Sequence, residues 1–366
     1  MRQLVCISNA PWNGLPNRTV QLVSRMKNTR ILFVDPPSGK RAWREEGEHV
    51  GKNITRVTAR PMPKTQSVFG QKRFAGYLKR RLEEYAFAKP VLWLTDPAQA
   101  GLVGRFDHGP VVFDCQEIPA LGDMSDKAGA LRARQTSGLV RAASVVFTQS
   151  EGAKNALSGE SASVIVIPNG VDYELFSRAQ EDTPAFPNDL FTVKNPILGH
   201  IGALGEHLEL EFVRKAATEH PEWSFVFVGE TPESDGVLQL QTLKNVYMLG
   251  VKPQKQLPMY LCRFDVCIGL YKSGGPSGDI SPMKLYEYLA SGRPIVSTPQ
   301  PAQTLDYADV VYIAGTADEF TAACRKASAE RDKWKVRQRI AYAQASSWDA
   351  RVTEIERALN ERDVFA

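Results

Sequence analysis

Short apolar runs alternate with segments of helical spacing along the whole chain. In the first half the runs are LVCIS, RILFVD, ITRVTA, VLWLTD, VVFDC, SVVFTQ and SVIVIP, and after residue 195 they are ILGHIGAL, WSFVFVG, NVYML, DVCIGLY, RPIVST and VVYIA. Strands that are apolar throughout and separated by helices indicate a parallel sheet covered on both faces. The pattern predicts two doubly wound, Rossmann-like α/β domains, facing a central cleft and binding ligands at the carboxyl ends of their strands.

A segment with three prolines between residues 184 and 196 and little periodicity separates the two halves. Such a segment favours a loop. The sequence therefore predicts an N-terminal domain at 1–176, a linker at 177–195 and a C-terminal domain at 196–345. The tail from Ser346, SSWDARVTEIERALNERD, has the spacing of an amphipathic helix.

Length and composition bound the class of protein. A chain of 366 residues is too long for one core of typical size. No run approaches the roughly 18 consecutive apolar residues of a membrane helix, and the apolar run at the N-terminus is shorter than that of a signal peptide. The five cysteines are odd in number and scattered, which favours reduced thiols and a cytoplasmic protein. Neither a CxxC nor an HxxxH pair occurs, so we expect no metal site.

Charge is unevenly distributed. Residues 1–170 hold 24 Lys and Arg against 14 Asp and Glu, and the remainder holds 21 against 27. A basic first half suggests contact with a phosphate, a lipid head group or a nucleic acid. A solvated surface with chance asymmetry is the other interpretation. No recognition helix or aromatic-basic sheet motif supports nucleic-acid binding.

The stretch SPMKLYEYLASGRPIVST, residues 281–298, predicts a helix that leads into a buried strand. Ser281 can cap the helix and Pro282 suits its first position. Apolar residues at helical spacing give it a buried face, and Gly292 is suited to end it in a left-handed conformation.

The same stretch has the features of an anion site. The preceding glycine-rich SGGPSGD lets backbone amides approach a ligand, and the helix start offers unpaired N–H groups. Lys284 in the first turn opposes the helix dipole unless a diphosphate lies there. Glu287, one turn later, could accept hydrogen bonds from two vicinal ribose hydroxyls. The alternative is a solvent-facing Lys–Glu pair at i,i+3.

Several motifs together resemble the retaining GT-B glycosyltransferases of the family-4-like group (glycosyl transferases group 1). They are SPMKLYEYLASGRPIVS, VFTQSEGAKNAL with VIVIPNGVDYELF, GHIGAL, LGVKPQKQLPMYLCRFDVCIGLY and SSWDARVTEIE. The resemblance spans nearly the whole chain and implies the GT-B fold, with residues 346–366 returning to the N-terminal, acceptor-binding domain. It also implies that the C-terminal domain binds a nucleotide sugar without a cofactor or metal.

The resemblance assigns donor-binding roles in the second domain. Glu287 matches the glutamate that holds the donor ribose, and Asp279 stands where the group has a first glutamate. We therefore expect Lys284, Asp279 and Glu287 to act in catalysis. The remaining donor contacts implied are Gly202, Ala203, Leu204, Val251, Lys252, Gly278, Ile280, Ser281 and Met283.

Two departures from the group's pattern occur. Asp279 is one methylene shorter than the usual glutamate. An Arg and a Lys usually follow the loop over the diphosphate, but here the residues are Glu206, His207, Leu208 and Glu209. Lys284 would then replace the absent charge.

In the first domain, NAPWNGLPNR resembles the group's glycine-bearing loop after the first strand. The resemblance implies that Asn13 and Gly14 lie near the transferred phosphate and that Arg18 contacts an anion. The group's His-Asp falls on Gln116 and Glu117, or is replaced by Asp114 and Glu117, so Glu117 is a candidate acceptor contact or a structural partner.

Residues 71–89 read QKRFAGYLKRRLEEYAFAK and predict a basic amphipathic helix. Its apolar face would carry Phe74, Tyr77, Leu78, Leu82 and Tyr85. One interpretation is a peripheral helix on an anionic membrane surface, which requires that face to point outward. The other is a helix packed on the sheet, with its charges in water.

The resemblance implies that the chain moves a sugar from a nucleoside diphosphate sugar to a glycan or lipid-linked acceptor, with retention, in bacterial-type polysaccharide or glycoconjugate biosynthesis. The alternative is a GT-B protein that is not a transferase, either a nucleotide-sugar epimerase or a degenerate sugar-nucleotide binder.

Overall fold

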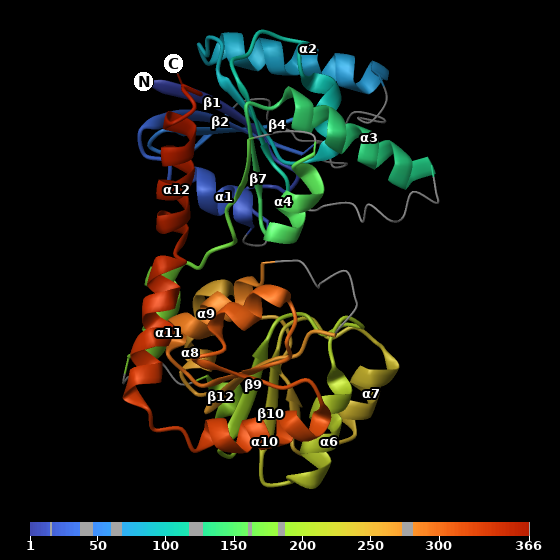
Figure 1. Cartoon of the computed structure of the whole chain (residues 1–366), viewed down its shortest axis with the longest axis vertical. Helices are drawn as coiled ribbons and strands as arrows, with labels where there is room; N and C mark the ends of the chain where they lie inside the picture. The colour runs from blue at the N-terminus through green and yellow to red at the C-terminus, as the bar shows by residue number, and fades with distance from the viewer. Residues whose placement is uncertain are drawn as a thin grey trace. The chain divides into compact units, whose positions relative to one another are not determined.

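The computed structural model describes residues 1–14, 17–36, 47–59, 68–116, 127–159, 163–181, 187–272 and 281–365 (Figure 1). The chain divides into two compact units. Unit 1 comprises Met1–Pro168 and Arg351–Ala366, and unit 2 comprises Asn169–Ala350.

Unit 1 contains an eight-stranded sheet in the order β3-β4-β2-β1-β5-β6-β7-β8 among the described residues. The strands are β1 Arg2–Ile7, β2 Thr29–Asp35, β3 Glu48–Gly51, β4 Ile54–Thr58, β5 Val91–Leu94, β6 Val111–Asp114, β7 Val145–Thr148 and β8 Val164–Val166. All neighbours pair in parallel except β3 and β4, which are antiparallel. Strands that precede β5 in the sequence lie on one side of β1 and strands from β5 onward lie on the other, so the strand order changes direction between β1 and β5.

Helices cover both faces of this sheet (Figure 1). They are α1 Arg18–Val23, α2 Val68–Glu84, the 3-10 helix η1 Pro97–Leu102, α3 Lys127–Ala142, α4 Glu151–Leu157 and α12 Trp348–Asn360. From residue 351 onward, α12 belongs to unit 1. Ile355 and Leu359 of α12 are fully buried, and Arg2 of β1 donates a hydrogen bond of 2.5 Å to Asn360. The return of the C-terminal segment therefore follows from its apolar face.

Unit 2 contains a parallel six-stranded sheet in the order β11-β10-β9-β12-β13-β14 in the part of the chain that is described. The strands are β9 Ile197–Ile201, β10 Ser224–Val228, β11 Val246–Met248, β12 Val266–Gly269, β13 Ile295–Ser297 and β14 Val311–Ile313. Every apolar run interpreted as a strand in the sequence is a strand in the structure.

Two cores lie on the two faces of the unit 2 sheet. The longer helices are α6 Leu210–Glu219, α7 Asp235–Gln241, α9 Met283–Ser291, α10 Ala317–Ser328 and α11 Lys333–Ala345. The shorter ones are α5 Tyr173–Phe176, η2 Ser177–Gln180, η3 Asn188–Leu190, η4 Gln254–Gln256, α8 Leu257–Leu261 and η6 Ala302–Tyr307. One core contains residues of α8 and α9, and the other contains residues of α6, α7 and α10.

The division between the units does not fall in the expected linker. Unit 2 begins at Asn169, and the described parts of 177–195 belong to it. Ala179, Leu190 and Val193 are buried in one of its cores. The described part of this segment therefore contributes to the core of unit 2 and does not act as a linker between the units.

Helix α2 packs against the sheet of unit 1. Phe74, Tyr77, Leu78 and Leu82 are all buried in its core. Of the two interpretations of this segment, the helix packed on the sheet with its charges in water is confirmed, and the one that points the aromatic face outward is wrong. Exposed Lys72, Arg73, Lys79 and Arg80 line the outer side. No described helix has the length and apolar character to cross a membrane.

Candidate functional site

The candidate site lies in unit 2, where the strand order changes direction between β9 and β12. Parallel doubly wound sheets bind ligands outside the carboxyl ends of the strands at such a point. The loop after β9 and the start of α9 meet here. The hydroxyl of Tyr288 on α9 accepts a hydrogen bond of 2.9 Å from the backbone N–H of Ile201 and donates one of 3.4 Å to the carbonyl oxygen of the same residue. This contact ties the helix to the end of β9.

The start of α9 is fixed by a residue far away in the sequence. The Ser281 hydroxyl accepts a hydrogen bond of 2.9 Å from the backbone N–H of Asn169, and the Asn169 side chain donates one of 2.9 Å to the carbonyl of Ser281. Pro282 is the residue that precedes the helix, so Ser281 does not cap it as the sequence predicts. The helix ends at Gly292 with a φ of 71°, as expected.

Lys284 and Glu287 form an ion pair on the first turns of α9. The distance from Lys284 Nζ to Glu287 Oε2 is 2.9 Å, and the side chains are 29% and 9% exposed. The pair has the expected i,i+3 spacing, but the Glu287 side chain is buried. A buried carboxylate with one cationic partner differs from the solvent-facing pair that was the alternative interpretation.

A small enclosed space joins Lys284 to His200 at the end of β9. Its volume is about 10 Å³, and its walls include Ser297 and Thr304. Such a volume is at the lower limit for one water molecule. Because His200 and Ser297 lie at the ends of their strands, Lys284, which lines the same space, also lies at the strand ends.

His200 is a residue that sequence reasoning did not assign. Its Nδ1 lies 3.0 Å from the carbonyl oxygen of Ile268, to which it donates. Burial, together with the charges of Lys284 and His207, lowers the pKa of His200 to about 4, although the hydrogen bond to Ile268 opposes this. The ring is thus neutral at pH 7, with Nε2 as an acceptor. A histidine within the apolar run ILGHI is the signal that could have revealed it.

The loop after β9 is held close to β10. Gly202 has a φ of 153°, and its N–H donates a hydrogen bond of 2.9 Å to Val228. A Cβ on Gly229 would come within 2.0 Å of the Gly202 carbonyl oxygen, so the two backbones can approach this closely only because residue 229 is glycine.

The two residues after Gly202 have different environments. Ala203 is exposed, whereas Leu204 is buried in a core and its N–H bonds to the Glu230 carbonyl at 2.8 Å. Ala203 is thus accessible to a ligand, and the Leu204 side chain serves packing.

The expected contact at Lys252 has a partner within unit 2. Lys252 Nζ lies 2.7 Å from Asp189, and the Tyr260 hydroxyl donates to the same carboxylate at 3.0 Å. The hydrogen bond with Asp189 raises the pKa of Lys252. Neighbouring Val251 is exposed, and Met283 is half-buried at the start of α9.

In unit 1, the Arg18 side chain is buried and forms an ion pair with Asp114. Its Nε donates to both oxygens of Asp114 at 3.0 and 3.1 Å, and Nη1 donates to the Pro168 carbonyl at 3.1 Å. This pair neutralises the charge that the sequence assigned to an anion contact. Asn13 and Gly14 are exposed in the turn after β1.

Four of the expected site residues, Glu117, Gly278, Asp279 and Ile280, lie outside the described residues. Among those that are described, no group of three or more His, Cys, Asp and Glu side chains is arranged to hold a metal ion.

Comparison with solved structures identifies the fold. Sucrose-phosphate synthase of Thermosynechococcus elongatus is 15% identical with a TM-score of 0.71, and covers 99% of both chains. HepE of Anabaena, in complex with UDP and glucose, is 16% identical with a TM-score of 0.71, over 98% of this chain and 99% of that chain. The fold is GT-B.

Sequence comparison adds the activity. Residues 195–330 match the family model for glycosyl transferases group 1. TuaH of Bacillus subtilis (strain 168), described as a teichuronic acid biosynthesis glycosyltransferase, is 28% identical over 282 residues, 72% of this chain and 70% of that protein. These two matches and the GT-B fold support a glycosyltransferase. The family match covers α9 and the loop after β9, which form the candidate site.

Proposed function

We propose that this chain transfers a sugar from a nucleoside diphosphate sugar to a glycan or lipid-linked acceptor, with retention at the anomeric carbon. The observation that carries the proposal is the pair Lys284 and buried Glu287, at the strand ends where the unit 2 sheet changes direction. Glu287 would hold the ribose hydroxyls, and Lys284 the diphosphate.

The comparisons favour this donor class. HepE has been solved with UDP and with UDP-glucose, and TuaH is described as acting in teichuronic acid biosynthesis. We therefore assign the chain to bacterial polysaccharide or glycoconjugate biosynthesis. The five buried cysteines are all free thiols, which agrees with a cytoplasmic setting. Peripheral membrane attachment is not part of the proposal, because the apolar face of α2 is buried.

The reaction breaks the bond between the anomeric carbon and the diphosphate oxygen, and forms a bond from the same carbon to an acceptor hydroxyl oxygen. The departing phosphate takes the hydroxyl proton on the same face, and the products are the glycoside and the nucleoside diphosphate. Negative charge grows on the leaving oxygen, so Lys284 and backbone N–H groups would bind the transition state more strongly than the ground state.

The test is nucleotide release from a panel of UDP and GDP sugars, with and without acceptors, followed by NMR of the product's anomeric configuration. We expect release that depends on both donor and acceptor, and a product with the donor's configuration. Conversion of the donor sugar without nucleotide release would indicate an epimerase instead. Inversion would refute the stereochemical part alone.

A further inference from the structure

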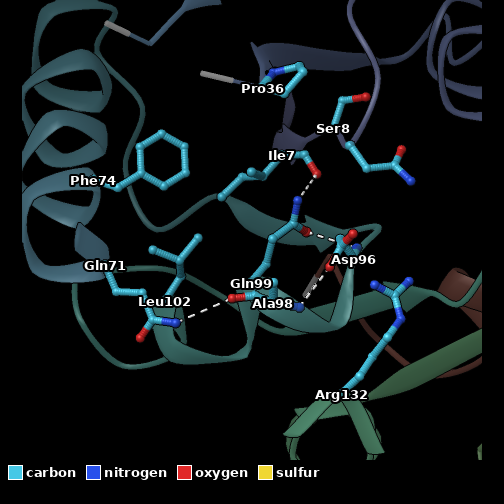
Figure 2. A pocket seen from close by; sticks show the side chains of 11 residues that line it. Ile7, Ser8, Pro36, Gln71, Phe74, Asp96, Ala98, Gln99, Leu102 and Arg132 are labelled. Carbon is cyan, nitrogen blue, oxygen red and sulfur yellow. Dashed lines mark hydrogen bonds between the residues drawn. The ribbon is translucent and has the colours of Figure 1, made fainter. Parts of the chain in front are cut away.

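Unit 1 holds a second cavity, which the donor chemistry does not use. Its volume is about 220 Å³, and residues from β1, η1, α2 and α3 line it (Figure 2). A cavity of this size, below that of typical drug-sized ligand sites, suits one sugar ring rather than a longer chain.

The position of the cavity is that of a ligand site. Ile7 is the last residue of β1, and Asp96 follows β5 by two residues. The strand order of unit 1 changes direction between these two strands. Ligands of doubly wound sheets bind at such a point, beyond the carboxyl ends of the strands.

The wall of the cavity is rigid before any ligand arrives. The Gln99 side chain donates to the Ile7 carbonyl at 3.1 Å and accepts from the N–H groups of Thr95 and Asp96 at 2.9 and 3.1 Å. Gln71 of α2 donates to the Ala98 carbonyl at 3.3 Å. These bonds join β1, η1 and α2 around the cavity, so little ordering cost remains for binding.

The lining combines an apolar wall with two charged groups. Figure 2 shows Phe74 and Leu102 on one side and the Arg132 guanidinium directed toward the Asp96 side. The Asp96 carboxylate caps η1, because it accepts hydrogen bonds from the Ala98 N–H, to Oδ1 at 2.7 Å, and from the backbone N–H of Gln99. A carboxylate has about four acceptor sites, so capacity remains for ligand hydroxyls.

The helices beside the cavity are strongly basic. Helix α3 carries Lys127, Arg132, Arg134 and Arg141 and no acidic residue, and the first ten residues of α2 carry Lys72 and Arg73 and no acidic residue. This local field favours an anion over a neutral ligand. Arg132 is the cation of this group that lines the cavity, and its planar fork suits a carboxylate or phosphate.

We propose that this cavity binds a sugar ring that carries an acidic group. The apolar face of the ring lies against Phe74, its hydroxyls donate to Asp96, and its acidic group accepts from Arg132. The inference rests on the proposed function in one respect, namely that the ring is the terminal sugar of the acceptor. Specificity for an acidic acceptor would then reside in unit 1 and be independent of the donor.

The test is an NMR titration of the full chain with methyl glucuronide, glucose 6-phosphate and methyl glucoside. We expect the acidic rings to bind at least tenfold more tightly than the neutral ring, since a charged hydrogen bond is lost without the acid. Comparison of the two acidic rings tells whether the acid is a carboxylate or a phosphate.

Two variants and a matched control complete the test. Arg132→Met should remove the preference for acidic rings, whereas Arg134→Met, an exposed arginine two residues further along α3, should keep it. Ala98→Leu should weaken binding of all three rings by filling the cavity, with thermal melts as a check of folding. Equal affinity for acidic and neutral rings, or unchanged affinity in Arg132→Met, would overturn the inference.

The outcome is separable from that of the proposed function. UDP affinity is measured on the same samples, and its site lies in unit 2. Transfer of sugar by a chain that fails to prefer acidic rings overturns only the inference on the cavity. Selective binding of acidic rings by a chain that releases no nucleotide from any donor supports the inference and counts against the proposed function.

Discussion

Asn169 and Ser281 lie 112 residues apart in the sequence and are joined by two hydrogen bonds of 2.9 Å. One residue comes from the motif IPNGVD and the other begins SPMKLYE. Two of the motifs that carry the resemblance to GT-B glycosyltransferases are therefore in direct contact within unit 2. Asn169 positions the start of α9 and, with it, Lys284 and Glu287.

Asn169→Ala should lower the free energy of unfolding by about 1–3 kcal/mol, because the buried Ser281 carbonyl loses its donor. Urea unfolding measures this loss. Asn188→Ala, at an exposed asparagine of η3, is the control and should change stability by less than about 0.5 kcal/mol. Ser281→Ala should also lower stability, because the buried Asn169 N–H loses its acceptor. Unchanged stability in both variants would contradict the two contacts.

Glu287→Ala should weaken UDP or GDP binding by roughly 2–3 kcal/mol, since two hydrogen bonds to a charged group are lost. Glu287→Gln should cost less, about 1–2 kcal/mol, because one acceptor remains. Calorimetry measures both affinities, and exposed Glu181→Ala is the control. Thermal melts accompany the titrations, because Glu287 is buried. Unchanged affinity in folded Glu287→Ala would remove the ribose assignment.

Lys284→Met should lower kcat more than it raises KM, because charge on the leaving diphosphate grows in the transition state. Lys284→Arg should restore little, since a planar fork replaces a compact charge at a site enclosed by His200 and Thr304. Steady-state kinetics with the donor identified by nucleotide release separates the two constants. A variant with full kcat and a raised KM alone would mean that Lys284 contributes only uniform binding.

Stability should depend on pH through His200. Its pKa is about 4 in the folded protein, against about 6.5 for an unperturbed histidine. The unfolded chain therefore binds the proton more readily. The contribution is fully present above pH 6.5 and is lost as pH falls toward 4, to a total of about 3 kcal/mol.

Urea midpoints between pH 4 and 7.5 measure this dependence. His200→Asn keeps a donor toward Ile268 but does not titrate, so its midpoint should fall less steeply below pH 6.5 than that of the unmodified chain. Parallel curves for the two proteins would show that His200 is not the responsible group.

Arg18→Met should destabilise the protein by about 3–5 kcal/mol, because it leaves the Asp114 carboxylate buried without its cation. The double variant Arg18→Met with Asp114→Leu should recover much of that loss, since no charge then remains in the apolar site. Thermal or urea unfolding measures the three proteins. Nucleotide affinity should be unchanged in the folded variants, and a large fall would restore Arg18 as an anion contact.

The strands were predictable because each is a continuous apolar run, which only a sheet covered on both faces can bury. Strand β3 was missed because its sequence, EHVG, is short, mostly polar and half-exposed. An antiparallel edge strand needs no apolar run, since only its backbone pairing with β4 is required.

The partners of charged residues were not predictable. Arg18 and Asp114 lie 96 positions apart in the chain, and Lys252 and Asp189 lie 63 positions apart. Nothing in either spacing indicates a contact. Each of these cations was expected to meet a ligand. The fold gives each a carboxylate partner, and for Arg18 and Asp114 the reason is that burial of a charge requires a partner.

The sequence by itself determined the two parallel sheets, the left-handed end of α9 at Gly292 and the local pair Lys284 and Glu287, because periodicity, glycine conformation and i,i+3 spacing are properties of neighbouring residues. Only the tertiary structure decided that the aromatic face of α2 turns inward, that Asn169 holds Ser281 and that Phe74, Asp96 and Arg132 share one cavity. These outcomes depend on which surfaces, distant in sequence, pack together when helices cover the sheet. The spacing of residues along the chain does not specify that packing.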